Sequence, residues 1–392
     1  MDTAAAATPM GSTQTVPSSL GAFAAYFLRL GALGFGGPIA LVGYMQRDLV
    51  ENRRWVSKQD YVEGLALAQL APGPLAAQLA IYLGWVRAGT LGATLVSVAF
   101  VLPSFLMVLT LSALYVRFGG LPWMQGAFYG IGAAVIAIIT RSAYKLVPLT
   151  LSTDRLLWAL CCVSGVITAW TQSEIVWQFV LSGVIALAVR ARPRGGGYAA
   201  VLALAPWLTT GLQEPARLST LWKITLYFAE AGTFVFGSGL AIVPFLYGGV
   251  VSQFHWLTER QFLDAVAVAM ITPGPVVITV AFIGYLVAGI PGATLAALGV
   301  FLPCYLFVVI PATYFRRAVQ DARVKAFVAG ITAAATGAIV GAAVVLGRRA
   351  LVDLPAGVIG VVTLILLVYA RKIPEPVVIA AAGIAGLVIK GY

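Results

Sequence analysis

Two ionisable residues stand at matching places inside apolar stretches of this chain. Arg29 lies six residues before Phe35, and Glu230 lies six residues before Phe236. A charge near the bilayer centre costs ~2.5–3.5 kcal/mol on insertion scales, so such a residue usually has a partner or a function. We expect the planar guanidinium of Arg29 to bind an anionic substrate and Glu230 to gate it or to carry a coupling proton. The alternatives are a static ion pair between the two, or an arginine that snorkels to the interface.

A Pro-Gly-Pro tripeptide occurs in each half of the chain, at Pro72–Pro74 and at Pro273–Pro275. Proline removes a backbone donor and clashes with the preceding turn, so a regular helix cannot continue through either one. The break strands carbonyl groups on one side and amides on the other, and in lipid these groups must be satisfied or line a cavity. A half-helix that begins at Pro74 or Pro275 presents an amide end that favours an anion. A packing kink is the alternative explanation.

Further polar and glycine-rich positions surround these breaks. Gln69 and Gln78 flank the first one, where they either donate to an oxyanion or satisfy stranded carbonyls. Glu63 and Asp264 each lie nine residues before a Pro-Gly-Pro, where an acid complements the helix dipole; coupling or gating is their alternative role. The candidate substrate-binding residues are Arg29, Phe35, Gly36, Gly37, Pro38, Gln69, Pro72, Gly73, Pro74, Gln78, Phe236, Gly237, Ser238, Gly239, Pro273, Gly274 and Pro275, and the candidate coupling or gating residues are Glu230, Glu63 and Asp264.

Capping signals predict where the helix before each Pro-Gly-Pro begins. Ser57 and Thr258 are each followed three residues later by a side chain that can complete a capping box, Asp60 and Gln261 respectively. A tryptophan just before each cap fits the membrane interface. The first proline of each break lies 15 residues after the cap, which is ~22 Å along a helix. Both breaks are therefore expected near the middle of the membrane.

The composition places these elements in a bilayer. The chain of 392 residues is 60% hydrophobic and 10% charged, whereas soluble domains carry roughly 25% charged residues. Its mean hydropathy is +0.95. We predict an all-α polytopic membrane protein, because apolar stretches that can cross ~30 Å of hydrocarbon recur throughout. The expected spans are 20–46, 61–86, 89–117, 122–148, 155–172 and 174–190, and then 220–250, 262–287, 290–315, 326–347, 352–370 and 374–390.

The chain also repeats itself. The two Pro-Gly-Pro breaks are 201 residues apart, and residues 89–94 return in similar form as residues 289–294. So long a repeat in an apolar chain indicates a transporter of two homologous halves, with broken helices at the transport site. We predict two repeats of about six helices each, with Gly/Pro-broken helices at the midplane. The expected divisions are a disordered tail over 1–18, a first repeat over 19–190, a basic, glycine-rich linker with a short apolar segment over 191–218, and a second repeat over 219–392.

Charge and residue content disfavour several function classes. The formal net charge of +11 would suggest nucleic acid in a soluble protein, but here the basic residues cluster at loops, where they set topology and contact lipid head groups. We expect no metal site and no cofactor, because the cysteines show no ligand spacing. An intramembrane enzyme is disfavoured because the single histidine, His255, lies in a loop. A primary pump is disfavoured because the chain has no GxxxxGK[ST] loop.

The basic residues do not define one topology. An arrangement that places most basic loops inside in both halves leaves Arg190, Arg192 and Arg194 outside, against the positive-inside rule. Parallel repeats, inverted repeats and re-entrant broken segments therefore all remain open.

The motifs resemble the chromate ion transporter family in its long, two-domain form. The resembling segments are Phe27–Pro38, Leu65–Leu83 and Ala267–Tyr285, and the resemblance extends over residues 20–390. It implies an inner-membrane secondary transporter of bacteria, not an enzyme, that exports chromate and confers chromate resistance, with sulfate as a candidate second substrate. Ser238 stands where the family pattern has glycine.

Chromate and sulfate are both tetrahedral dianions, and the sequence does not separate them. A channel-like carrier or general permease for another small anion is the alternative function. The expected partners are a small inorganic oxyanion, a proton as coupling ion and the lipid bilayer. We expect no nucleic acid, and a homodimer remains open.

Overall fold

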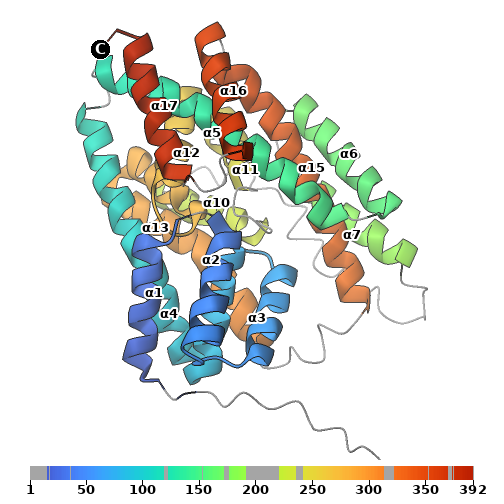
Figure 1. Cartoon of the computed structure of the whole chain (residues 1–392). Coiled ribbons are helices and arrows are strands. Elements are labelled where there is room, and N and C mark those ends of the chain that lie inside the picture. The colour runs from blue at the N-terminus through green and yellow to red at the C-terminus, as the bar shows by residue number, and fades with distance from the viewer. Residues whose placement is uncertain are drawn as a thin grey trace, which may run out of the picture.

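The computed structural model describes residues 16, 18–35, 37–118, 122–151, 153–171, 176–190, 220–234, 242–312, 322–351, 353–369, 373 and 375–391. Over these residues the chain is helical and contains no strand, which confirms the all-α prediction (Figure 1). The first half contains α1 (Leu20–Leu33), α2 (Gly37–Met45), the π-helical segment η1 (Gln46–Asn52), α3 (Lys58–Leu70), α4 (Leu75–Phe118), α5 (Pro122–Leu151), α6 (Arg155–Thr171) and α7 (Val176–Arg190). The second half contains α10 (Thr220–Phe234), α11 (Ile242–Tyr247), the π-helical segment η2 (Gly248–Gln253), α12 (Glu259–Ile271), the 3₁₀ turn η3 (Val276–Ile278), α13 (Thr279–Ala312), α15 (Ala322–Ala350), α16 (Leu354–Tyr369) and α17 (Glu375–Ile389).

The first predicted span, 20–46, is a helical hairpin rather than a single crossing. α1 ends at Leu33, and α2 begins at Gly37 and runs back beside it. The open ends of the hairpin meet, because the Val16 N–H donates a hydrogen bond to the Arg54 carbonyl over 2.8 Å. A segment that enters and returns on one side does not cross the membrane.

The second predicted span, 61–86, is also a hairpin, and the Pro-Gly-Pro break forms its tip. α3 begins at the predicted N-cap, with the Ser57 hydroxyl accepting a hydrogen bond from the Asp60 N–H over 3.0 Å. The predicted capping box is not completed, because the Asp60 carboxylate accepts from the Ser57 hydroxyl over 2.6 Å instead of from the backbone of Ser57. The chain then returns along α3 in the first part of α4, where the Tyr82 hydroxyl lies 3.5 Å from the Glu63 carboxylate. In the second half, the capping box of Thr258 and Gln261 is present at the start of α12, as predicted.

α4 changes direction sharply within its length. Ala88 and Gly89 leave the helical conformation, and Gly89 has φ +60°, which favours glycine. Gly84 and Gly92 lie so close across this reversal that a Cβ on either would collide with the carbonyl of the other. α13 reverses in the same way at residues 288–289. The hairpin tip and the reversal together explain how one apolar run holds a short returning helix and a long crossing helix.

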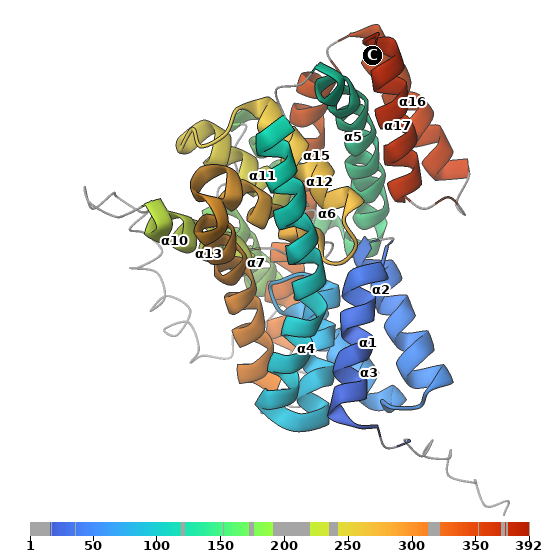
Figure 2. The same ribbon diagram turned by 90° about the vertical axis from the view of Figure 1, so that its left-hand side faces the viewer.

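The two repeats run in opposite directions. The long parts of α4 and α13, after their reversals, lie side by side (Figure 2). Thr94, near the start of this part of α4, lies 2.8 Å from the Tyr305 hydroxyl, far along α13. Tyr115, near the end of α4, instead packs against Phe282, in the part of α13 that precedes its reversal, with ring centres 5.2 Å apart. Equivalent helices are therefore antiparallel, which means that the repeats are inverted about a pseudo-twofold axis in the membrane plane.

The repeats also exchange their last two helices. α16 and α17 pack against α5 of the first repeat, and α6 and α7 pack against α15 of the second (Figure 1). Glycines permit the close approach at equivalent places, because a Cβ on Gly130 would collide with the Ala382 carbonyl and one on Gly330 with the Ser182 carbonyl. The interlocked repeats therefore share one structure rather than forming two separate bodies.

Four helical segments are long and apolar enough to cross a membrane. They are Leu75–Phe118, Trp123–Tyr144, Val276–Ala312 and Lys325–Val345, and five further described helices are apolar but shorter. The chain is therefore a multi-pass membrane protein with broken helices in both repeats. The predicted linker, 191–218, and most of the predicted tail lie outside the described residues.

Candidate functional site

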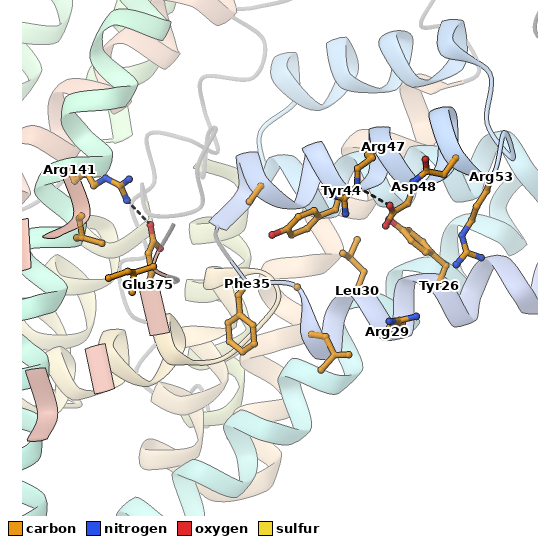
Figure 3. A pocket seen from close by; sticks show the side chains of 16 residues that line it. Tyr26, Arg29, Leu30, Phe35, Tyr44, Arg47, Asp48, Arg53, Arg141 and Glu375 are labelled. Carbon is orange, nitrogen blue, oxygen red and sulfur yellow. Dashed lines mark hydrogen bonds and ion pairs between the residues drawn. The ribbon is translucent and has the colours of Figure 1, made fainter. Parts of the chain in front are cut away.

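A cavity of about 920 Å³ lies beside the first hairpin of repeat one. The hairpin helices α1 and α2, with η1, form one wall, and residues of α5, α16 and α17 form the opposite wall (Figure 3). Its lining residues are Tyr26, Arg29, Leu30, Leu33, Gly34, Phe35, Ala40, Tyr44, Arg47, Asp48, Asn52, Arg53, Arg141, Leu367, Ile373 and Glu375. Four arginines face two carboxylates in this lining, so the cavity has a formal excess of two positive charges.

Three of the four arginines are held by neighbours. Arg47 pairs with Asp48 over 3.2 Å, and Arg141 pairs with Glu375 over 3.2 Å. The Arg53 guanidinium lies over the Trp55 ring at 4.6 Å from its centre, within reach of a cation–π interaction. These contacts fix the three guanidinium groups in the walls of the cavity.

Arg29 differs from the other three. It is exposed, it projects from α1, and it forms no ion pair or hydrogen bond with any residue that the structure describes (Figure 3). An uncompensated guanidinium in a membrane helix is costly unless a ligand or water meets it. Arg29 is therefore a side chain of this cavity that is available to an anion.

The inner end of the cavity meets a junction between the two repeats. Gly34, at the end of α1, lines the cavity, and its carbonyl accepts a hydrogen bond of 3.0 Å from the Gly274 N–H of the second Pro-Gly-Pro. Ser104 in α4 donates to the Pro273 carbonyl over 2.7 Å and lies 3.2 Å from the Gly31 carbonyl. The first break of repeat one is thus bonded to the second break of repeat two.

The other Pro-Gly-Pro is satisfied differently. Gln78 is fully buried and donates from Nε2 to the Pro72 carbonyl over 2.5 Å. Cys304 occupies the position in α13 equivalent to Ser104, and its sulfur lies beside Gly73 but donates to the Val300 carbonyl. Of the two roles expected for Gln78, the structure therefore shows satisfaction of a carbonyl that the proline break strands.

The structure brings only part of the predicted substrate set to the cavity. Arg29 and Phe35 line it, whereas both Pro-Gly-Pro tripeptides pack in the interior at the junctions. Gln69 is exposed on α3. Gly37 and Pro38 begin α2, while Gly36, Phe236, Gly237, Ser238 and Gly239 lie outside the described residues. The Gly274 N–H, just before the expected half-helix, is bonded to the Gly34 carbonyl.

The three acids predicted to couple or gate lie in different settings. Glu230 is half-buried in α10 and has no ion pair with any described residue, so the static pair with Arg29 does not form. Glu63 is half-buried and accepts a hydrogen bond from Gln59 over 3.0 Å. Asp264 is 5% exposed and accepts one from the Tyr115 hydroxyl over 2.7 Å.

Several residues of this site were not predicted from the sequence. Arg141 could have been found, because it is a charge inside the apolar stretch 122–148 and the reasoning applied to Arg29 covers it. Arg47, Arg53 and Ser104 could not, because loop arginines and helical serines are common and only the tertiary fold brings them together.

Comparison with known proteins gives a consistent match over both repeats. A family model described as "Chromate transporter" matches residues 21–187 and 222–387. The chain is 57% identical to "Chromate transport protein" of Cupriavidus metallidurans over 97% of this chain and 96% of that protein. It is 56% identical to "Probable chromate transport protein" of Synechococcus elongatus (93% and 94% covered) and 32% identical to "Chromate transport protein" of Pseudomonas aeruginosa (95% and 93%). No solved structure matches the chain.

Proposed function

The chain belongs to the chromate transporter family, and from this premise we propose that it is a secondary active transporter that exports chromate across the bacterial inner membrane and so confers chromate resistance. Sulfate is its proposed second substrate, and the proton its coupling ion. The observation that carries the proposal is the unpaired Arg29 in a cavity with two excess positive charges. Named relatives at high identity are transport proteins, so we assign no enzymatic activity.

The charge of the cavity supports a dianion as substrate. Arg29 would offer a planar fork that matches two oxygens of a tetrahedral oxyanion. Arg47, Arg53 and Arg141, held by their neighbours, would add to the positive potential that concentrates anions there. A cavity at the upper end of the roughly 300–1,000 Å³ range of small-molecule pockets is much larger than one oxyanion, so the ion would enter with part of its hydration.

The distribution of basic residues supports a cavity that faces the cytoplasm. Arg47, Arg53, Arg54 and Lys58 lie in the short segment between α2 and the first residue of α3, and the Arg54 carbonyl accepts a hydrogen bond from the Val16 N–H, just before α1. By the positive-inside rule, the α1 end is cytoplasmic. Arg53 and Asn52 at this end line the cavity, which would therefore take up the anion from the cytoplasm.

Energetics favour export from such a cavity. Moving one charge through the membrane potential is worth about 2.3 kcal/mol per 100 mV, so a dianion leaving a negative interior gains about twice that. Proton entry would add to this driving force. The transporter therefore needs no nucleotide hydrolysis.

The width of the cavity favours a second candidate, a general permease for small anions on the same scaffold. With a volume of about 920 Å³, the cavity is too large to select among small anions by their size. This candidate predicts that chloride or nitrate competes with chromate as well as sulfate does.

Calorimetric titration of the purified protein with chromate tests the proposal. Arg29→Lys keeps the charge and loses the fork, so binding should weaken by about 1.5–3 kcal/mol, or roughly ten- to hundredfold in Kd. Arg54→Lys is the matched control, because Arg54 is exposed at the same end but does not line the cavity. Equal binding by wild type and Arg29→Lys would reject Arg29 as the anion ligand.

A further inference from the structure

A buried carboxylate lies on the far side of the inter-repeat junction from the cavity. Asp264 sits in α12 of repeat two and is 5% exposed. Its carboxylate accepts a hydrogen bond of 2.7 Å from the hydroxyl of Tyr115, near the end of α4. Tyr115 lies 11 residues after Ser104, which is ~16 Å along the helix from the junction. The carboxylate is thus deep in the protein but displaced toward the end opposite the cavity.

The surroundings of Asp264 make its charge state consequential. The Tyr115 ring packs edge-on against Phe128 at 5.6 Å and Phe282 at 5.2 Å, which shields the hydrogen bond from water. Arg260, exposed one turn earlier in α12, is a cation that favours the charged form of the carboxylate. α12 also packs against α4, α5, α11, α13, α17, η2 and η3, and of the described titratable side chains on these elements Tyr115 of α4 is hydrogen-bonded to Asp264. Burying a charged carboxylate with so little compensation is costly, and a bound proton removes that cost.

We propose that Asp264, hydrogen-bonded to Tyr115, is the site that binds the coupling proton during transport. This inference rests on the proposed function and adds which residue binds the proton and from which side the proton enters. Tyr115 belongs to the long helix of repeat one and Asp264 to the broken hairpin of repeat two. A movement of α12 against α4 would open the contact, hydrate the carboxylate and release its proton. The affinity of Asp264 for a proton would therefore depend on the position of the hairpin that contains α12. The tip of this hairpin is bonded, through Gly274, to Gly34 at the inner end of the cavity.

Glu63, the equivalent acid of repeat one, is half-buried and accepts a hydrogen bond from Gln59 on its own helix, whereas Asp264 accepts one from Tyr115 of the other repeat. The position of Asp264 toward the end away from the cavity suits exchange of an internal anion for an external proton.

Proteoliposomes containing the full chain test the inference with two assays. Counterflow of radiolabelled chromate against unlabelled chromate needs no driving force, and net flux can be measured with and without an imposed pH gradient. Asp264→Asn should retain counterflow and lose the acceleration by the pH gradient. Glu259→Gln, on the exposed first turn of the same helix, is the matched control and should keep both. An Asp264→Asn protein that still responds to the pH gradient overturns the inference.

A second variant keeps the inference testable if Asp264→Asn does not fold. Tyr115→Phe removes the hydroxyl that donates to the carboxylate but leaves the carboxyl group and the ring packing. Loss of a donor to the charged form makes the proton bind more tightly, so the pH of half-maximal transport should shift upward. An unshifted pH profile in Tyr115→Phe also overturns the inference. Absence of counterflow in the wild type would instead reject the proposed transport function.

Discussion

Arg29 and Glu230 hold equivalent positions in repeats that run in opposite directions. Each lies two residues before a glycine that packs against the backbone of a long helix, Gly31 on Phe100 and Gly232 on Val300. Inversion therefore places the two charges on opposite sides of the midplane, which explains why they form no pair. The first charge is available to an anion in the cavity, and the second is a half-buried acid in α10.

At this scale we predict that the double variant Arg29→Ala/Glu230→Ala inserts in the membrane and does not transport chromate. If the two residues formed a static ion pair, each single substitution would leave one uncompensated charge. The double variant would leave none, so its activity would return. Size-exclusion profiles of the purified protein control for folding, and chromate tolerance of expressing cells reads the activity. Restored tolerance in the double variant would mean that Arg29 is not a substrate ligand.

The sequence predicted the charges of the site better than their partners. Arg29 and Asp264 stand out because a charged side chain in an apolar stretch is rare. Tyr115 and Ser104 carry no such signal, since tyrosine and serine are ordinary in membrane helices and their roles arise from contacts across 149 and 169 residues. The assignment of Gln78 also needed the structure, because its amide can serve an anion or a carbonyl.

Helical hairpins are the elements that bring the breaks together. The residues 20–46 are long enough to span the membrane, and hydropathy does not distinguish one crossing from two short helices that return. In the structure α1 ends at Leu33, α2 begins at Gly37, and Val16 meets Arg54 at the open ends of the hairpin, which decides the matter. The caps, by contrast, were predicted correctly from Ser57 and Thr258, because an N-cap is a local pattern.

The first Pro-Gly-Pro gives a prediction about the hairpin that α3 and α4 form. Pro72→Ala/Pro74→Ala should let α3 continue straight through the tip, so that the returning part of α4 no longer packs beside α3. We expect membrane-inserted protein, seen by fractionation and immunoblotting, that has lost nearly all chromate transport. Wild-type transport by this variant would show that the break is only a packing kink.

The close packing of the α1 backbone on α4 gives a second prediction about the helices. A Cβ on Gly31 would collide with the Phe100 carbonyl, whereas a Cβ on Gly21 in the same helix meets nothing within 4 Å. Gly31→Ala should therefore displace α1 and destabilise the protein by about 1–3 kcal/mol. Gly21→Ala, the matched control, should be neutral or stabilising by up to about 1 kcal/mol. Thermal aggregation of both variants in detergent measures the difference, and equal midpoints would contradict the packing shown here.

Inversion is the property of the whole molecule on which alternating access depends. The repeat could be seen in the sequence, but the relative direction of the two repeats could not. Each broken segment had been counted as one membrane crossing, and with that count the positions of the basic loops favoured no single topology. With two re-entrant hairpins in each repeat, the basic segment that contains Arg53, Arg54 and Lys58 lies beside the start of α1. The pseudo-twofold axis relates the cavity on one side of the membrane to an equivalent position on the other side, where the transported ion can leave.

Accessibility at two equivalent positions tests inversion. Lys58 and Glu259 are the first residues of α3 and α12, lie 201 residues apart and are both exposed. In a background with Cys161, Cys162 and Cys304 replaced, Lys58→Cys should react with an impermeant maleimide only in everted vesicles, and Glu259→Cys only in intact cells. Labelling of both positions from the same side would show that the repeats are parallel.

Flux into everted vesicles tests whether the protein exports chromate from a cytoplasm-facing cavity through Arg29. Respiring everted vesicles have a positive and acidic interior, which drives a dianion inward and supplies the proton for exchange. We predict uptake of radiolabelled chromate that saturates, is competed by excess sulfate, and falls to the level of empty-vector vesicles in Arg29→Ala. Uptake by wild-type vesicles no greater than that of Arg29→Ala vesicles, with the two proteins present in equal amounts, would contradict export through Arg29.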